Sequence, residues 1–173
     1  MALCLLKLTR IFIELNSIEV PELVLKTDAW CNSRIDTINI NINYKIYEAS
    51  KNNCRPLIDY YIKNGAKDWN WSMKGAAERG HLHLIEFFIE RGANWWNMGM
   101  QGAAEGGHLH LVKFFIQKGA NDWNWGMYRA AHGGYLYLVE FFIKKGADNF
   151  QECLNIAKKY EYHHLIQLFT KLI

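Results

Sequence analysis

The sequence lacks an excess of charge of either sign. Its 20 basic and 17 acidic residues leave a formal net charge of only +3, and no run of like charges forms a tail. A protein that binds nucleic acid by neutralising phosphates needs a clustered basic surface. We therefore expect no nucleic-acid partner.

Cysteine is also scarce, and its spacing is irregular. The four cysteines form no Cys-x-x-Cys pair; they are Cys4, Cys31, Cys54 and Cys153. A disulfide scaffold or a structural zinc site needs denser and more regular spacing. We interpret these residues as reduced thiols of an intracellular protein.

The apolar N-terminus lacks the marks of a targeting or membrane-spanning segment. Lys7 and Arg10 interrupt its apolar run, no basic cluster precedes the run, and no small-residue cleavage site follows it. A secretory signal therefore fits poorly, and the run is shorter than the about 20 residues of a spanning helix. We predict a packed helix over residues 2–15 and no transmembrane segment. A helix lying on a membrane surface is the alternative.

A repeat of fixed length dominates the rest of the chain. Gly-Ala pairs begin at Gly65, Gly92, Gly119 and Gly146, a constant period of 27 residues. Such a period indicates a stacked array of structural units. Half of the residues are hydrophobic and 14% are aromatic, which is enough to form an ordered hydrophobic core. We predict an array over 44–173 with units at 46–66, 67–93, 94–120, 121–147 and 148–173.

Each unit has the pattern of two short helices. In the unit 67–93 the apolar residues at helical spacing are Met73, Ala76 and Ala77, then Leu84, Ile85, Phe87, Phe88 and Ile89. We expect Asn70, and its equivalents Asn97 and Asn124, to cap the first helix. The second begins near His81 or Leu82, and Gly80 and Gly92 end the two helices. Neither helix is long enough to be stable alone, so each must pack on its partner and on the next unit.

Residues 1–43 precede the array as a helical cap or a leader segment. A second short helix is predicted from Pro21 to Lys26, with the proline in its first turn. Farther on, Ile38, Ile40 and Ile42 alternate with asparagines, a period-two pattern typical of a strand. An extended leader into the repeats would give the same pattern.

The string A-A-x-x-G-H-L-x-L-V-x-F-F-I-x-x-G-A resembles the ankyrin repeat over roughly residues 46–173. The matching positions are Ala76, Ala77, Gly80, His81, Leu82, Leu84, Ile85, Gly92 and Ala93, and again Ala103, Ala104, Gly107, His108, Leu109, Leu111, Val112, Gly119 and Ala120. The resemblance implies an all-α, right-handed, ankyrin-like solenoid of helix-turn-helix repeats that binds proteins through its concave face.

The repeat departs from that family in length. Ankyrin repeats have about 33 residues with a β-turn finger between helix pairs, and here the missing residues fall where the finger would be. The family's Thr-Pro-Leu-His becomes Trp71-Ser72-Met73-Lys74. We therefore predict a solenoid without long β-finger loops. Short repeats rich in tryptophan are similar to those of large and giant DNA viruses, which implies a viral protein that binds host proteins in the host cytoplasm.

Two columns of large side chains are candidates for function. We interpret Trp69, Trp96, Trp123 and Phe150 as packing between units. The second column, Trp71, Met98 and Trp125, lies on the side of the first helix away from Met73. Aromatic residues ringed by mixed charge are typical of interface hot spots. The candidate protein-binding residues are Trp71, Lys74, Glu78, Gln101, Glu105, Trp125, Tyr128, Arg129 and His132; ordinary solvated surface is the alternative.

The histidines and glycines of the repeat do not indicate a cofactor site. Equivalent histidines in stacked units lie about 10 Å apart, too far to share a metal. We expect His81 and His108 to cap the second helices, as the resemblance implies, and His83 to face outward. Gly75 and Gly102 favour close helix packing or a seat for tryptophan, because no phosphate-loop context surrounds them. We predict no metal and no cofactor.

No arrangement of residues is typical of catalysis. No serine or cysteine stands with a histidine and an acid in a recognisable order, and acid pairs such as Glu78 and Glu105 recur only because the unit repeats. We predict a non-catalytic, monomeric protein-protein interaction module. The alternative is a structural or self-associating protein of a virion or a membrane-proximal layer.

Overall fold

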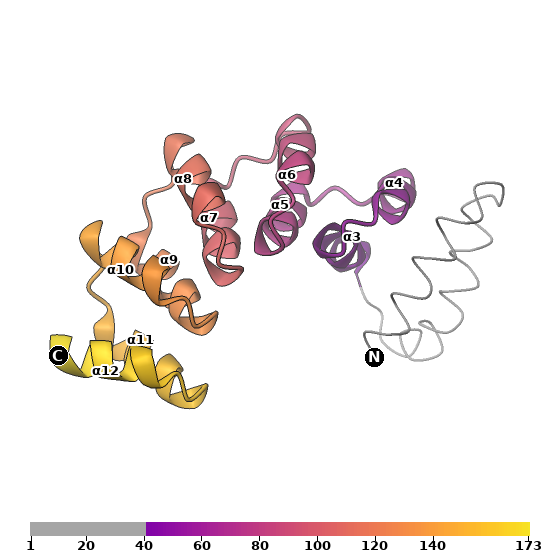
Figure 1. Ribbon diagram of the computed structural model, residues 1–173. Coiled ribbons are helices and arrows are strands. Elements are labelled where there is room, and N and C mark those ends of the chain that lie inside the picture. The colour runs from indigo at the N-terminus through magenta and orange to yellow at the C-terminus, as the bar shows by residue number, and fades with distance from the viewer. Residues whose placement is uncertain (1–40) are drawn as a thin grey trace. The chain divides into compact units, whose positions relative to one another are not determined.

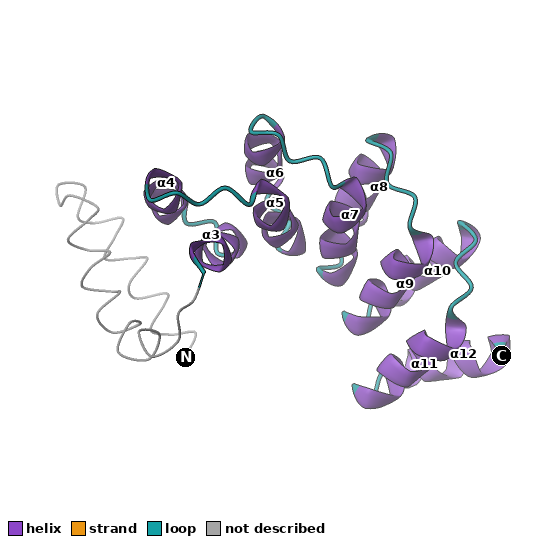
Figure 2. Ribbon diagram, turned by 180° about the vertical axis from the view of Figure 1, so that it is seen from behind, coloured by secondary structure: helices purple, strands orange, loops and turns teal. Residues whose placement is uncertain are grey.

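The computed structural model describes residues 41–173, and this part of the chain forms ten α-helices in five pairs without a β-strand (Figure 1, Figure 2). The first helices of the pairs are α3 (Ile42–Lys51), α5 (Trp69–Glu78), α7 (Trp96–Glu105), α9 (Trp123–His132) and α11 (Phe150–Lys159). The second helices are α4 (Arg55–Lys63), α6 (Leu82–Ile89), α8 (Leu109–Gln117), α10 (Leu136–Lys144) and α12 (His163–Leu172). The fold is an all-α, ankyrin-like solenoid, as the sequence predicts.

The pairs stack in chain order. Each first helix packs on the first helix of the next pair, and each second helix packs on the first helix of its own pair. In Figure 1 the first helices line the inner side of an arc and the second helices its outer side. One face of the described unit is therefore built almost entirely from first helices.

The repeated apolar residues form one continuous core. Phe88, Phe115, Phe142 and Phe169 are fully buried, one in each of the last four second helices. The alanine pairs of the first helices are fully buried beside them, and their small side chains let neighbouring helices approach. The column Trp69, Trp96, Trp123 and Phe150 is half-buried against this core, with the Trp69 ring stacked 6.3 Å from Phe88. This column packs the units, as interpreted from the sequence.

Glycines allow two features of the stack. Gly80 adopts φ +80° just after α5, where the His81 N–H bonds the Ala76 carbonyl at 3.0 Å and so closes the helix end. Gly75 and Gly102 lie where first helices approach each other. A Cβ on Gly75 would lie 2.8 Å from the Tyr47 carbonyl oxygen, and one on Gly102 would lie 2.7 Å from that of Lys74. The close-packing interpretation of these two glycines is confirmed.

The predicted asparagine caps are wrong. Asp68 caps α5 and Asp122 caps α9, each accepting an N–H from the third helical residue at 3.2 Å. Asn70 and Asn124 lie one position inside their helices, as does Asn97 in α7. The aspartates, two residues earlier, already occupy the capping position, so the asparagine side chains are available for other partners.

Those partners are backbone groups of the next unit. The Asn70 Oδ1 accepts the N–H groups of Asn94 and Trp95 at 2.9 and 3.0 Å, and Asn97 holds the following loop in the same way. A short loop without a β-hairpin has no strand partner for its own N–H groups. In a β-hairpin finger, these N–H groups would bond to the neighbouring strand. Here the asparagine side chains of the preceding unit accept them instead.

The predictions for the N-terminal region fall mostly outside the described residues. These are the helices at 2–15 and 21–26, together with Ile38 and Ile40. Ile42, the last isoleucine of the alternating pattern, lies not in a strand but at the start of α3. The side chain of Asn41 caps this helix by accepting the Asn43 N–H at 3.0 Å, which favours helix over extended chain at this point.

Candidate functional site

A row of large exposed side chains follows the first helices. The third residue of each of the first four first helices belongs to it; these residues are Tyr44, Trp71, Met98 and Trp125. We call these four residues the aromatic ridge. The side chains of Tyr44, Trp71 and Trp125 are 53%, 43% and 51% exposed, and Met98 is half-buried. It is their alignment along consecutive helices, more than their exposure one by one, that marks a candidate contact surface.

Neighbouring side chains hold the two ridge tryptophans in place. The Trp71 ring meets Tyr47 edge-on at 6.1 Å, and the Lys74 Nζ lies 4.9 Å from its centre. Trp125 meets Tyr128 edge-on at 5.4 Å, with the Arg129 guanidinium 5.9 Å from its centre. Edge-on rings and cations over a ring face are attractive. The two ridge tryptophans are therefore largely ordered before any partner arrives.

Trp95 is a further exposed residue that was not among the sequence candidates. It is 53% exposed and stands just before α7, three residues ahead of Met98. Trp95 therefore adds an exposed aromatic side chain close in sequence to the ridge residue Met98. A signal was present in the sequence: Trp95 takes the repeat position that Asp68 and Asp122 hold in neighbouring units.

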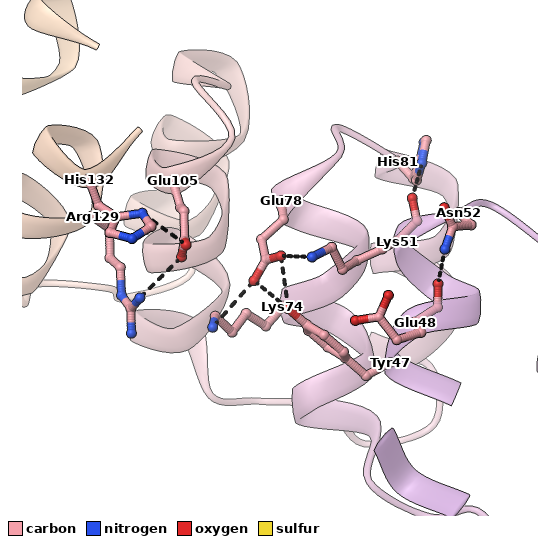
Figure 3. Close-up of polar contacts among 10 residues, drawn as sticks. All are labelled: Tyr47, Glu48, Lys51, Asn52, Lys74, Glu78, His81, Glu105, Arg129 and His132. Atoms are coloured by element: carbon pink, nitrogen blue, oxygen red, sulfur yellow. Dashed lines mark hydrogen bonds and ion pairs between the residues drawn. The ribbon is translucent and has the colours of Figure 1, made fainter. Parts of the chain in front are cut away.

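Two of the candidate residues, Lys74 and Glu78, lie between helices rather than on open surface. Their side chains are each only 9% exposed. The Glu78 carboxylate accepts the Tyr47 hydroxyl at 2.9 Å and pairs with Lys51 at 3.1 Å and Lys74 at 3.3 Å (Figure 3). Burial, followed by the negative charge of Glu78, raises the pKa of the Tyr47 hydroxyl far above its usual range. This cluster joins α3 to α5 and leaves little of either side chain for a partner.

The equivalent carboxylate one unit later is more open. The Glu105 side chain is 23% exposed, and it meets Arg129 Nη1 and His132 Nδ1, both at 3.3 Å (Figure 3). The other nitrogen of His132 bonds the Tyr160 hydroxyl at 3.0 Å. Gln101 and Tyr128 are half-buried near these residues in sequence. The candidates Gln101, Glu105, Tyr128, Arg129 and His132 thus keep partial access to solvent.

The histidines bridge units instead of capping helices. Neither α6 nor α8 has a side-chain cap, so the prediction of capping by His81 and His108 is wrong. The His81 Nε2 donates to the Lys51 carbonyl of the previous unit at 3.1 Å, and the exposed His83 bonds the Asn53 side chain at 2.9 Å. The glycine turn places each histidine over the preceding unit, where free carbonyls at a helix end need donors.

The described residues include two free cysteines and no cluster of potential metal ligands. Residues 41–173 hold no group of three His, Cys, Asp or Glu side chains that could bind a metal ion. Of the two cysteines in this range, Cys153 is fully buried, and burial raises its pKa to about 12. Its reactive thiolate form is therefore strongly disfavoured.

The chain was compared with protein-family models and with curated proteins. No protein-family model matches the chain, and no curated protein matches it. Among the helices of residues 41–173, none has the length and apolar character to cross a membrane.

Proposed function

We propose that this protein is a non-catalytic interaction module that binds a partner protein on the aromatic ridge. The observation that carries the proposal is the alignment of Tyr44, Trp71 and Trp125 at one repeat position, all about half exposed. The core residues repeat closely while the ridge residues vary in type. A fixed scaffold with a variable exposed face is what a binding surface needs.

The physical basis of binding is preorganisation. Tryptophan and tyrosine bury a large area with few rotatable bonds, and here neighbouring rings and cations already orient them. Little side-chain entropy is then lost when a partner covers them. The more exposed candidates Gln101, Glu105, Tyr128, Arg129 and His132 would form the polar rim.

The biological setting rests on the resemblance to viral ankyrin-like repeats. That resemblance supports a host protein as the partner and the host cytoplasm as the location, where this protein would modulate a host or immune process. In this proposal the chain acts as a monomer and needs neither a cofactor nor a metal.

Affinity capture from cell lysate tests the proposal. The full chain is compared with the double variant Trp71→Ala/Trp125→Ala and with Leu82→Ala. Leu82 is 38% exposed at the start of α6, a second helix, and so provides a control for the loss of an exposed apolar side chain away from the ridge. We expect the double variant to lose the captured protein and Leu82→Ala to retain it. Undiminished capture by a folded double variant would remove the aromatic ridge from consideration.

A further inference from the structure

The distance at which helices usually pack matches one turn of a polyproline II helix. The aromatic ridge presents one large side chain per unit, from consecutive first helices that pack on each other. Packed helices lie about 8–10 Å apart. A polyproline II helix has three residues per turn and rises about 3.1 Å per residue, so the same side recurs every 9 Å or so. A β-strand presents the same side every 7 Å or so. Its side chains would therefore lose register with the ridge side chains within two units.

The tryptophans of this surface also carry unused hydrogen-bond donors. Within residues 41–173, no hydrogen bond takes up the indole N–H of Trp71, Trp95 or Trp125. Indole nitrogen donates only, so these groups need acceptors when a partner covers them. The carbonyls of a polyproline II helix have no internal partner, whereas those of an α-helix are already bonded. An α-helix comes near this spacing every two turns, at about 10.8 Å, but it leaves the indole donors unsatisfied.

The charge at two repeat positions beside the aromatic ridge changes along the stack. Lys67, Asn94, Asn121 and Asp148 occupy one repeat position in the loops before the first helices, and all are exposed. Glu152 takes the ridge position in α11 and is also exposed. Asp68 and Asp122 are half-buried and serve as helix caps. At these two repeat positions the exposed charge therefore changes from positive at Lys67 to negative at Asp148 and Glu152.

We infer that the occupant of the aromatic ridge is a proline-rich segment of the partner in the polyproline II conformation. It spans about ten residues, since three turns cover the distance from Tyr44 to Trp125. Its apolar residues lie between successive ridge side chains, and its carbonyls accept the indole N–H groups. An acidic residue at one end lies over Lys67 and a basic residue at the other over Asp148 and Glu152. This inference rests on the proposed function and names the chemistry of its partner.

Calorimetric titration of the full chain with synthetic peptides tests the inference. The probe is a 12-residue peptide (a length set by about four turns) with proline at every third position, glutamate at one end and arginine at the other. It is made in both chain directions. The control peptide replaces every proline with alanine. We expect one direction of the proline peptide to bind with a stoichiometry of one, and alanine to weaken it at least about tenfold.

Protein variants locate the site and its polarity. We expect Trp71→Ala/Trp125→Ala to weaken the proline peptide at least about tenfold and Leu82→Ala to leave it within about twofold. Combining Lys67→Glu with Asp148→Lys and Glu152→Lys should reverse the preferred peptide direction. Equal binding of the alanine peptide, or unchanged affinity in the tryptophan variant, would overturn the inference. If no proline peptide binds while lysate capture still requires the two tryptophans, the inference fails and the proposed function stands.

Discussion

The α3–α5 and α7–α9 junctions use the same repeat position in different ways. Glu78 at the first and Glu105 at the second are equivalent carboxylates, 27 residues apart. Glu78 is 9% exposed and meets two lysines and a phenol, whereas Glu105 is 23% exposed and meets an arginine and a histidine. The α3–α5 junction thus has a buried ion cluster and the α7–α9 junction has more exposed ion pairs, although the core alanines of α5, α7 and α9 are buried alike.

The residue that separates the two junctions is at the position of Gly75. The same position holds Gly102 in α7 and Arg129 in α9. At Gly75 the backbone of α3 comes too near for any side chain, while Arg129 fits beside Glu105 with 27% of its side chain exposed. One position of the repeat therefore decides whether two first helices touch closely or leave room for charged side chains.

The largest expected effect comes from giving the first junction the residue of the second. In Gly75→Arg the new Cβ would lie 2.8 Å from the Tyr47 carbonyl oxygen, which is backbone and cannot turn away. We expect a loss of about 3 kcal/mol or more in the free energy of unfolding. The reverse change, Arg129→Gly, should cost only about 1–2 kcal/mol, from the glycine in a helix and the lost ion pair. Urea unfolding of both variants measures the difference; equal losses would contradict the comparison.

The next effect separates the two carboxylates. Glu78→Gln leaves the buried Lys74 and the half-buried Lys51 without a counter-charge. Breaking such a pair is strongly unfavourable when it is fully buried; with Lys51 partly exposed we expect a loss of about 2 kcal/mol. Glu105→Gln acts on more exposed partners and should cost less than about 1 kcal/mol. Thermal unfolding in low salt and in 1 M salt checks this, since only the Glu105 contribution should be strongly screened.

The third effect should be the same at two neighbouring junctions. Asn70 and Asn97 each accept two backbone N–H groups of the next unit. Replacing either with alanine should cost about 1–2 kcal/mol, because the loop N–H groups lose their acceptors. Amide hydrogen exchange at Asn94 and Asn121 should rise in the matching variant alone. Exchange that does not change would mean that solvent already satisfies these groups.

The smallest effect is a dependence on pH carried by His108. Burial, followed by the charges of His110 and His81, lowers its pKa, and a hydrogen bond to the Glu78 backbone opposes the shift in part. The unfolded chain then binds more protons than the folded one below the usual histidine pKa of about 6.5. Stability should be full above that pH and fall as the pH drops below it. His108→Tyr, which copies Tyr135 of the next unit, should flatten this part of the pH profile; an unchanged slope would exclude His108 as its source.

Much of the fold follows from the period of 27 residues. The register of Ala76, Leu84 and Phe88 predicts the helix pairs and the core, because a repeated unit must bury the same positions each time. The residues that cap the first helices could not be predicted from the period. Asp68 and Asn70 are both good capping residues, and only the start of α5 decides between them.

The candidate site was harder to predict, for a geometric reason. A helical wheel places Lys74 away from Met73, yet α5 has first helices on two sides, so that direction is also an interface. Trp71 and Trp125, near the start of their helices, remain exposed at 43% and 51%. Trp95 was missed because the candidates were taken from the column of Trp71 and Trp125, whereas Trp95 stands at the repeat position that Asp68 and Asp122 hold in neighbouring units.

Photo-crosslinking from the aromatic ridge tests the central claim most directly. A benzophenone amino acid is placed at Trp71 in one full-length protein and at Leu82 in another, and each is irradiated in cell lysate. We predict a covalent adduct with one defined protein from position 71, absent from position 82 and competed by unlabelled wild-type chain. No adduct from position 71, or the same adduct from both positions, would contradict the claim that the aromatic ridge is where this protein binds its partner.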